Sequence, residues 1–288
     1  MPHTETAWCP GCGNFSILDI MMRALAELDI RPENLVMVSG IGQAGKTPHY
    51  FRCNVFNGLH GRAIPAATAI KASNPKLVVI AEGGDGDMYG EGGNHFMHAI
   101  RRNPDITVLV HNNMVYGLTK GQASPTSLKG FRTPVQVKGV YLEPVNPLSL
   151  AISQGATFVS RAYCADREET GKVLKEAVAH RGFSLVDIYQ PCVTFNKVNT
   201  YRWFKEKTYY LDESHDASDR GKAFEKSIEK DALALGVFYR EEGRDTFEDN
   251  AINRNTPVPL YKYRVNRALL EELLDKKRTR APELTGQR

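Results

Sequence analysis

One stretch of the sequence combines acidic and amide side chains with several glycines. A Gly-Asp-Gly-Asp run contains Asp85, and Asn113 follows further along the chain. Glycines let the backbone approach phosphate oxygens and supply N–H donors, while a carboxylate suits a hard cation such as magnesium. With a nearby backbone carbonyl, these groups could hold a metal-bound diphosphate. Gly-Asp-Gly by itself is ordinary turn chemistry, so its position in the fold matters.

The elements around this run favour a ligand site. Apolar runs at 77–80 and 106–110 predict two strands, and 94–102 predicts a helix between them. Strand, turn, helix and strand form a βαβ unit, whose ligand crevice lies at the carboxyl ends of the strands. We expect Asp85 and Asn113 just beyond two such ends.

Two cysteines near the chain start have the spacing of a metal or redox site. Cys9 and Cys12 stand in Trp-Cys-Pro-Gly-Cys-Gly. The pattern alone leaves four alternatives: zinc, an iron–sulfur cluster, a thioredoxin-like redox pair, or two buried cysteines. A zinc ribbon would want a second paired motif, which the sequence lacks.

The motifs together resemble a known family. The segment from Asp85 to Asn113 resembles a thiamine diphosphate motif, and Gly-Leu-Thr-Lys-Gly-Gln at 117–122 narrows the resemblance. The combination is similar to the beta subunit of the 2-oxoacid:ferredoxin oxidoreductases, which include pyruvate and 2-oxoglutarate synthases. The resemblance covers residues 5–200. It implies an α/β fold with a doubly wound parallel sheet of the thiamine diphosphate-binding type over 1–195, and a C-terminal extension over 196–288.

The resemblance also implies an activity. Such a subunit takes part in coenzyme A-dependent oxidative decarboxylation of a 2-oxo acid, 2-oxoglutarate or pyruvate, to acyl-CoA and carbon dioxide. Electrons pass through a 4Fe-4S cluster to ferredoxin, and the reaction can run in the carboxylating direction. The family places the glutamate that activates the thiamine on the alpha subunit. The chain is therefore expected to be active only in an alpha–beta assembly, either a heterodimer or a dimer of heterodimers, with further small subunits in some arrangements.

Carried onto this sequence, the family motifs assign site residues. Magnesium would bind Asp85, Asn113 and the Val115 carbonyl. Lys46 and Lys120 would meet the substrate carboxylate, although a solvated loop is the alternative for each. Thiamine diphosphate would be surrounded by Ser39, Gly40, Ile41, Gly42, His60, Gly61, Gly84, Asp85, Gly86, Asp87, Asn113, Val115, Gly117, Leu118 and Thr119. Leu118 would also shape the substrate pocket, and a structural role is the alternative for His60.

The cluster ligands depart from the common pattern. By resemblance, Cys9, Cys12 and Cys192 hold the 4Fe-4S cluster, and many members carry a further cysteine where this chain has Gln43. Because iron–sulfur clusters prefer thiolates, we hypothesise that Cys53 supplies the fourth ligand. The alternative is a three-cysteine site with an exchangeable or missing iron. Cys164 is expected to be a small buried residue.

Composition narrows the class of protein. The formal net charge is +4 and no basic run is long enough to indicate nucleic-acid binding. No apolar stretch is long enough to span a membrane, and five cysteines are an odd number for a disulfide framework, so we expect a cytoplasmic protein. Two rival functions remain: a non-oxidative thiamine diphosphate-dependent decarboxylase or synthase, and a metal-stabilised electron-carrier module. The sequence does not identify the 2-oxo acid.

The remaining elements follow from apolar periodicity. Residues 14–29 and 168–180 predict helices, and 185–189 predicts the last strand of the sheet. Beyond Cys192 the chain has too few apolar runs to extend the sheet. Helical patterns occur there at 231–239 and 265–278. We expect this part to wrap the core or a partner subunit.

Overall fold

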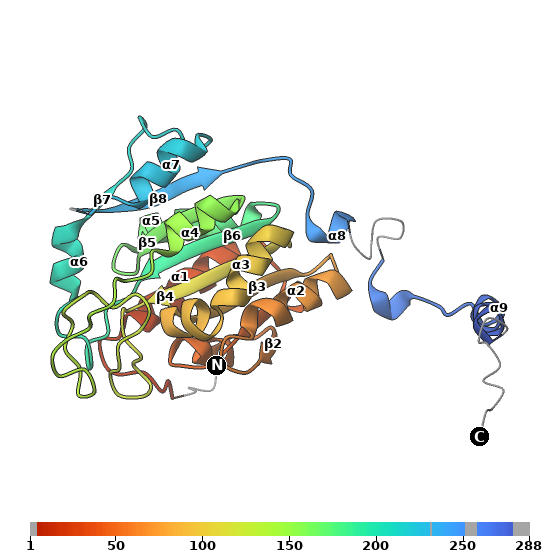
Figure 1. Ribbon diagram of the computed structural model, residues 1–288, viewed down its shortest axis with the longest axis horizontal. Coiled ribbons are helices and arrows are strands. Elements are labelled where there is room, and N and C mark those ends of the chain that lie inside the picture. Colours follow the sequence, from red (N-terminus) through yellow and green to blue (C-terminus); the bar gives the residue numbers. More distant parts are fainter. Residues whose placement is uncertain (1–4, 231, 251–257, 279–288) are drawn as a thin grey trace, which may run out of the picture.

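Eight strands form one continuous sheet in the computed structural model, which describes residues 5–230, 232–250 and 258–278 (Figure 1). Its order is β2-β1-β3-β4-β6-β5-β8-β7. Neighbours from β2 to β5 run parallel, β8 pairs antiparallel with β5, and β7 pairs parallel with β8. The strands are β1 Leu35–Ser39, β2 Asn54–Asn57, β3 Val78–Gly84, β4 Ile106–Asn112, β5 Phe158–Tyr163, β6 Phe183–Tyr189, β7 Thr208–Tyr210 and β8 Leu233–Arg240.

Helices cover both faces of this sheet. One buried cluster joins α1 and α5 to one face, through residues such as Ile17 and Leu174 against Met37. A second joins α2, α3 and α4 to the other face, through residues such as Ile64 and Phe96. The described α-helices are α1 Gly13–Glu27, α2 Ala63–Ser73, α3 Gly93–Arg102, α4 Pro147–Gln154, α5 Arg167–Ala179, α6 Tyr201–Lys207, α7 Arg220–Ser227, α8 Phe247–Asn250 and α9 Arg267–Arg278. The expected doubly wound α/β fold is confirmed.

Short helical turns fill several connections. Turns of 3-10 helix span Pro32–Asn34, Ala44–Tyr50 and Leu260–Lys262, and a π-helical turn spans Gly86–Glu91. Strand β3 continues through Gly84, so the first glycines of the glycine-rich run belong to the strand. Asp85 then opens the π-helical turn, directly beyond the carboxyl end of β3.

The C-terminal part corrects two predictions. The helix expected at 231–239 is wrong, because Leu233–Arg240 is strand β8. The strand at 185–189 is consequently not the last one, because β7 and β8 from the C-terminal part extend the sheet. Buried pairs at Ala234–Leu235 and Phe238–Tyr239 repeat every four residues, which mimics a helix. In the strand this spacing arises because the pairing with β5 shifts register between Val159 and Ser160, opposite Phe238, and so interrupts the alternation. Gly236, at φ +117°, lies just before this shift.

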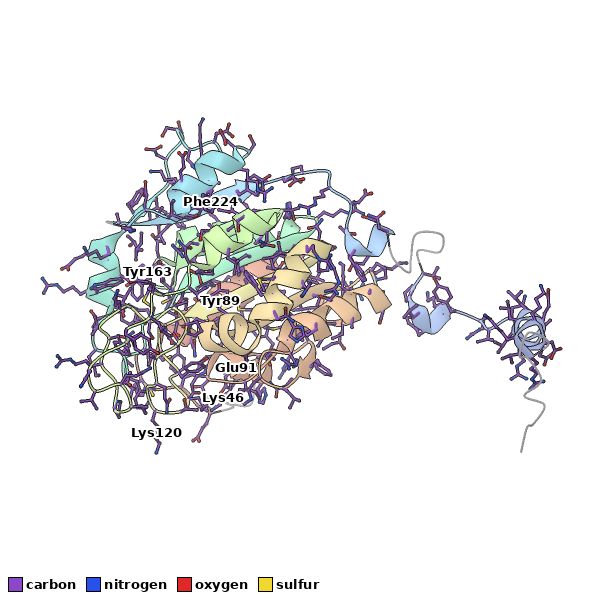
Figure 2. The ribbon with its side chains drawn as sticks, in the orientation of Figure 1. Lys46, Tyr89, Glu91, Lys120, Tyr163 and Phe224 are labelled. Atoms are coloured by element: carbon purple, nitrogen blue, oxygen red, sulfur yellow. The ribbon has the colours of Figure 1, made fainter. Side chains whose placement is uncertain are left out.

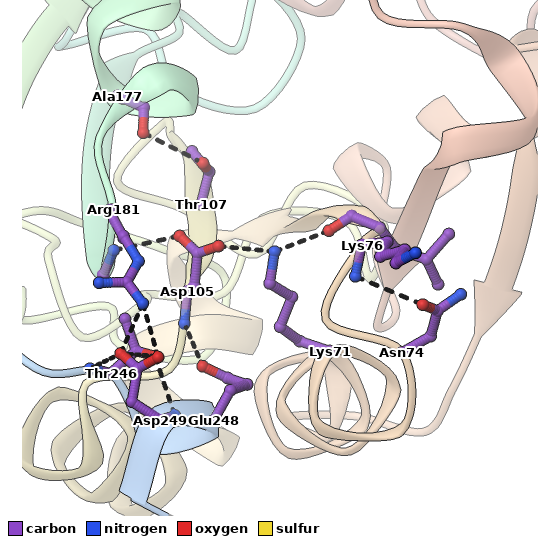
Figure 3. A network of polar contacts seen from close by, with 12 residues as sticks. Lys71, Asn74, Lys76, Asp105, Thr107, Ala177, Arg181, Thr246, Glu248 and Asp249 are labelled. Atoms are coloured by element: carbon purple, nitrogen blue, oxygen red, sulfur yellow. Dashed lines mark hydrogen bonds and ion pairs between the residues drawn. The ribbon is translucent and has the colours of Figure 1, made fainter. Parts of the chain in front are cut away.

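A polar network attaches the segment around α8 to the amino ends of the strands (Figure 3). Arg181 donates to both carboxylate oxygens of Asp249, at 2.6 and 2.7 Å. The Glu248 carboxylate accepts from the backbone N–H of Asp105 at 3.1 Å, and the Asp105 carboxylate pairs with Lys71 at 2.6 Å. Thus the chain returns to the core after β8.

Helix α9 confirms the helical pattern at 265–278 and lies well away from the sheet (Figure 1). None of its residues is buried. Its exposed leucines are Leu269, Leu270, Leu273 and Leu274. Among the described residues, no helix combines the length and the apolar character that a membrane span requires.

Candidate functional site

A pocket opens at the carboxyl ends of β1, β3 and β4, as expected for a parallel sheet. Several residues of the predicted cofactor site line it: Ile41, Gly42, His60, Gly84, Asp85, Gly86, Asp87, Asn113, Val115, Gly117, Leu118 and Thr119. The lining also includes residues that the cofactor prediction did not contain, namely Gln43, Ala44, Glu91 and Tyr116. The sheet topology therefore gathers the loop after β1, the glycine-rich run and the loop after β4.

Asp85 lies on the buried side of the pocket wall. Its carboxyl is 1% exposed and accepts hydrogen bonds from the hydroxyls of Ser124 and Thr126, each at 2.5 Å. Burial raises the pKa of this carboxyl to about 6, although both hydroxyls act in the opposite direction. A cation beside the carboxylate would restore its charged form. Sequence reasoning missed Ser124 and Thr126 because nothing in their local pattern marks them.

Asn113 occupies the position beyond β4 that the motif predicts. Its Oδ1 accepts from the backbone N–H of Val115 at 3.1 Å, and its Nδ2 donates to Oε1 of Gln190 at 3.2 Å. Met114 between them has a positive φ of 57°, which turns the chain sharply. The two candidate oxygen donors after β4, on Asn113 and Val115, thus lie within one tight turn that borders the pocket.

Asp87 ties two pocket loops together. Its Oδ1 accepts from the backbone N–H groups of Ile41 at 3.2 Å and Gly61 at 2.9 Å. A Cβ on Gly40 would stand 2.0 Å from the Asp87 carboxylate, so this close approach requires glycine. Gly40 and Gly61 therefore pack against Asp87 behind the pocket surface. Ser39 is also behind it, where its hydroxyl donates to the carbonyl of Gly45 at 2.9 Å.

The two candidate substrate lysines do not line the pocket. Lys46 is half-buried in the 3-10 turn after β1, and Lys120 is exposed at a positive φ of 77°. Figure 2 shows both on the same side of the molecule, with Lys120 projecting from its edge. Leu118 does line the pocket and is 41% exposed. Of the predicted substrate contacts, the structure therefore brings Leu118 to the pocket.

Tyr116 and Glu91 form a polar pair at the pocket. The Tyr116 hydroxyl donates to Oε1 of Glu91 at 3.2 Å. A Cβ on Gly86 would stand 2.2 Å from the Tyr116 ring, so the ring packs directly on the glycine-rich turn. Burial, followed by the charge of Glu91, raises the pKa of the Tyr116 phenol well above its usual range. The phenol therefore stays protonated and donates.

Three cysteines lie near one another beside this pocket. The N–H of Cys12 donates to the carbonyl of Cys9 at 3.0 Å, which closes the Cys-Pro-Gly-Cys turn. Burial raises the pKa of the Cys12 thiol to about 11, and the nearby thiolates of Cys192 and Cys9 add to the shift. Sγ of Cys192 is 3.7 Å from where a Cβ on Gly117 would stand. Gly117 lines the pocket, so the cysteines and the pocket are adjacent.

The structure does not bring Cys53 to these three cysteines. Cys53 precedes Asn54, which pairs with Val36, three residues before β1 ends at Ser39. Cys53 is therefore four residues from that edge, which at about 3.3 Å per residue is roughly 13 Å below the edge that carries Cys192. Burial raises the pKa of its thiol, with Glu82 as the charged neighbour.

Cys164 is fully buried, as predicted. It lies behind the Cys9–Cys12 turn, where a Cβ on Gly13 would stand 2.8 Å from its Sγ. Within the described part of the chain, no group of three His, Cys, Asp or Glu side chains is arranged to hold a single metal ion. Thiolates of a cluster bind different irons and need not converge on one point.

Comparison with known proteins agrees with this architecture. The model of the thiamine pyrophosphate enzyme C-terminal TPP binding domain matches residues 37–188, and that of the C-terminal part of the pyruvate ferredoxin oxidoreductase beta subunit matches 192–255. A 2-oxoacid:ferredoxin oxidoreductase subunit beta from a Sulfolobus species is 45% identical over 267 residues, which cover 88% of this chain and 87% of the relative. The chain belongs to the 2-oxoacid:ferredoxin oxidoreductase beta subunits.

Other members of this beta-subunit family extend the comparison. The 2-oxoglutarate oxidoreductase subunit KorB of Mycobacterium tuberculosis is 46% identical over 192 residues, 67% of this chain and 52% of the relative. Among solved structures, a 2-oxoglutarate:ferredoxin oxidoreductase from Magnetococcus marinus, with 2-oxoglutarate, coenzyme A and succinyl-CoA bound, superposes with a TM-score of 0.86 at 32% identity. The match covers 97% of this chain and 94% of that one.

Proposed function

We propose that this beta subunit serves a coenzyme A-dependent oxidative decarboxylation. A 2-oxo acid would yield acyl-CoA and carbon dioxide, while two electrons leave through a 4Fe-4S cluster to ferredoxin. The observation that carries the proposal is the adjacency of two sites. Asp85 and Asn113 stand at neighbouring strand ends in one pocket, and the same pocket contains Gly117, against which Cys192 lies. A decarboxylation site next to three cysteines suits a reaction that must remove electrons.

The residues fit magnesium and a diphosphate. Asp85 would give one carboxylate oxygen, and Asn113 and Val115 would give an amide and a backbone oxygen, which are the donors that magnesium prefers. The raised pKa of Asp85 fits a cation, because among the described residues its charged neighbour is another carboxylate, Asp187, and no cationic side chain pairs with it. Thiamine diphosphate, when bound, supplies the electron sink for loss of carbon dioxide. Gly84 would leave the backbone open to the diphosphate, whereas Gly86 makes room for the Tyr116 ring.

The other pocket residues would position the cofactor. Asp87 holds the loops of Ile41 and Gly61 in place. Those loops bring Ile41 and His60 to the pocket, where they would contact the cofactor. Tyr116 packs on Gly86 and keeps the turn of Asp85 in position.

The cysteines fit a 4Fe-4S cluster in which three irons are bound by thiolates and the fourth iron has a ligand other than cysteine. Cys9, Cys12 and Cys192 would bind three irons through thiolates. Oε1 of Gln43 is buried and has no hydrogen-bond partner within the described part of the chain. The Gln43 backbone is fixed next to Cys9, because its carbonyl accepts from the indole N–H of Trp8 at 2.8 Å. Leaving such an oxygen unpaired costs about 1–3 kcal/mol, which an iron ligand would offset. We assign the fourth position to this amide oxygen in place of Cys53.

The substrate and the partner follow from the same proposal. Lys46 and Lys120 are cations on the pocket side of the molecule, and a closing movement could bring either to the substrate carboxylate (Figure 2). Methylene-scale differences between 2-oxo acids are worth only about 1–3 kcal/mol, so pyruvate and 2-oxoglutarate both remain candidates. The alpha subunit would complete the site, and the assembly would work in the cytoplasm with reduced cysteines.

The test is product analysis of the complex of this chain with its alpha subunit. The complex, with thiamine diphosphate and magnesium, would be given a panel of 2-oxo acids, coenzyme A and ferredoxin. The proposal predicts one acyl-CoA and two reduced ferredoxins for each carbon dioxide released, for one acid above the others. Aldehyde release without reduction of ferredoxin would identify a non-oxidative decarboxylase instead.

A further inference from the structure

Gln190 lies between the two proposed cofactor sites. It follows β6, is 1% exposed, and its backbone N–H donates to the carbonyl of Asn112 at 2.9 Å. The end of β4 and the end of β6 are therefore tied together at this residue.

The two ends of the Gln190 amide contact different sites. Oε1 accepts from Nδ2 of Asn113 at 3.2 Å. Nε2 donates to Sγ of Cys12 at 3.4 Å and to the carbonyl of Pro191 at 3.1 Å. One side chain thus joins the candidate magnesium ligand Asn113 to the candidate cluster ligand Cys12.

We propose that Gln190 is a positioning residue that couples the diphosphate site to the iron–sulfur cluster. Toward Cys12, its N–H group sets the reduction potential of the cluster. Toward Asn113, its carbonyl oxygen holds the amide so that Oδ1 is directed to the cation. This inference rests on the proposed function, because it needs both cofactors to be present.

The effect on the cluster has a definite sign. A reduced cluster carries one more negative charge than the oxidised one, so an N–H donor to a ligand sulfur stabilises the reduced form and raises the potential. The amide is fully buried, so water does not weaken the interaction. The effect on Asn113 concerns orientation: its Nδ2 is engaged by Gln190, which leaves only Oδ1 for the metal.

Packing alone would give different results on substitution. A Cβ on Gly13 would stand 2.8 Å from Cγ of Gln190, so the side chain also fills space against the Cys12 turn. Gln190→Met keeps an unbranched side chain of similar length and removes all three polar contacts of the amide. Gln190→Glu keeps an acceptor for Asn113 and removes the N–H donor to sulfur. The matched control is Gln154→Met at an exposed position on α4.

The experiment uses the complex with its alpha subunit, loaded with iron, thiamine diphosphate and magnesium. Redox titration followed by electron paramagnetic resonance gives the midpoint potential, and calorimetric titration gives the affinity for thiamine diphosphate. Both Gln190 variants should have a lower midpoint potential than wild type. Gln190→Met should also bind thiamine diphosphate about 10-fold more weakly, whereas Gln190→Glu keeps most of the affinity. Gln154→Met should match wild type in both.

The outcomes separate this inference from the proposed function. Loaded variants with the wild-type potential and the wild-type affinity would overturn the coupling role alone. A wild-type complex that binds no iron, or no thiamine diphosphate, would overturn the proposed function itself. If Gln190→Met fails to assemble, the potential of the Gln190→Glu complex decides, and an unchanged value overturns the inference.

Discussion

At the scale of single residues, Asp85 and Asp87 stand two positions apart and have different roles. Asp85 faces hydroxyls in a buried wall, while Asp87 accepts two backbone N–H groups from neighbouring loops. The glycine-rich pattern predicted both as cofactor contacts. The pattern could not separate them, because the loops that Asp87 orders come from distant parts of the chain.

Replacement of Asp85 tests its role as the charged metal ligand. Asp85→Asn removes the charge and keeps the shape, so we expect affinity for thiamine diphosphate with magnesium to fall by at least about 100-fold, the upper end of what outer-shell changes cost. Calorimetric titration measures this affinity. Asp87→Asn serves as the comparison. It should lower the melting temperature and should reduce the affinity for thiamine diphosphate less than Asp85→Asn does. Equal losses of affinity in the two variants would contradict the assignment.

Gln43 stands where the resemblance predicts a cysteine, and its buried side-chain oxygen has no hydrogen-bond partner among the residues that the structure describes. A thiolate binds iron more tightly than an amide oxygen, so Gln43→Cys should slow the loss of iron from the purified complex under an oxidant. Gln43→Ala should leave a three-iron cluster. Iron content and electron paramagnetic resonance measure both effects. Cys53→Ser is the control, and loss of iron in that variant would return the fourth position to Cys53.

At the scale of elements, the parallel βαβ part was predictable and the C-terminal strands were not. The run 106–110 is apolar except for Thr107 and buried at every position, as is typical of central parallel strands. Strand β8 is antiparallel to β5 and its pairing shifts register at Phe238, so its buried residues acquire a helical spacing. Its partner β5 lies some seventy residues earlier in the sequence, and no local pattern records that pairing.

The docking of α8 should depend on pH through Glu248. Burial raises the pKa of this carboxyl, with Asp105 as a further acidic neighbour. Because the pKa is raised in the folded state, the protonated form is favoured there, and stability falls as pH rises through the raised value. Glu248→Gln keeps an acceptor for the Asp105 N–H, so it should stabilise the protein at pH 8 and lose that advantage toward pH 4. Denaturant unfolding at both pH values checks this.

The control for Glu248→Gln is Glu225→Gln, at an exposed position on α7. It should leave the unfolding free energy unchanged at both pH values. A Glu248→Gln protein that is less stable than wild type at pH 8 would show instead that its charge supports the network of Figure 3.

At the scale of the whole molecule, the chain carries apolar surface that its own fold does not cover. Exposed side chains gather in the loop after β4, at Val135, Val137, Tyr141 and Leu142, and along α9. Apolar patches of this kind mark protein–protein contacts. The relatives of this chain are named beta subunits, which implies a partner subunit that could cover this surface.

Removal of residues 258–288, the C-terminal segment that contains α9, tests whether this segment binds the alpha subunit. None of the residues of α9 is buried against the core. The shortened chain should therefore keep its melting temperature and bind the alpha subunit at least about 10-fold more weakly. Sedimentation or light scattering of mixtures measures the binding. A shortened chain that assembles normally would show that this C-terminal segment has another role. Leu273→Ser in the full chain would show whether the leucines of α9 cause any loss of binding.

The central claim is that decarboxylation and electron removal occur at adjacent sites of this subunit. The most direct measurement mixes a 2-oxo acid, without ferredoxin, with the complex of wild-type chain and alpha subunit and follows the cluster by absorbance and electron paramagnetic resonance. We expect the cluster to become reduced as carbon dioxide is released, only with thiamine diphosphate and magnesium present, and not in the Asp85→Asn complex. Release of carbon dioxide while the cluster stays oxidised, or by an iron-free complex, would contradict it.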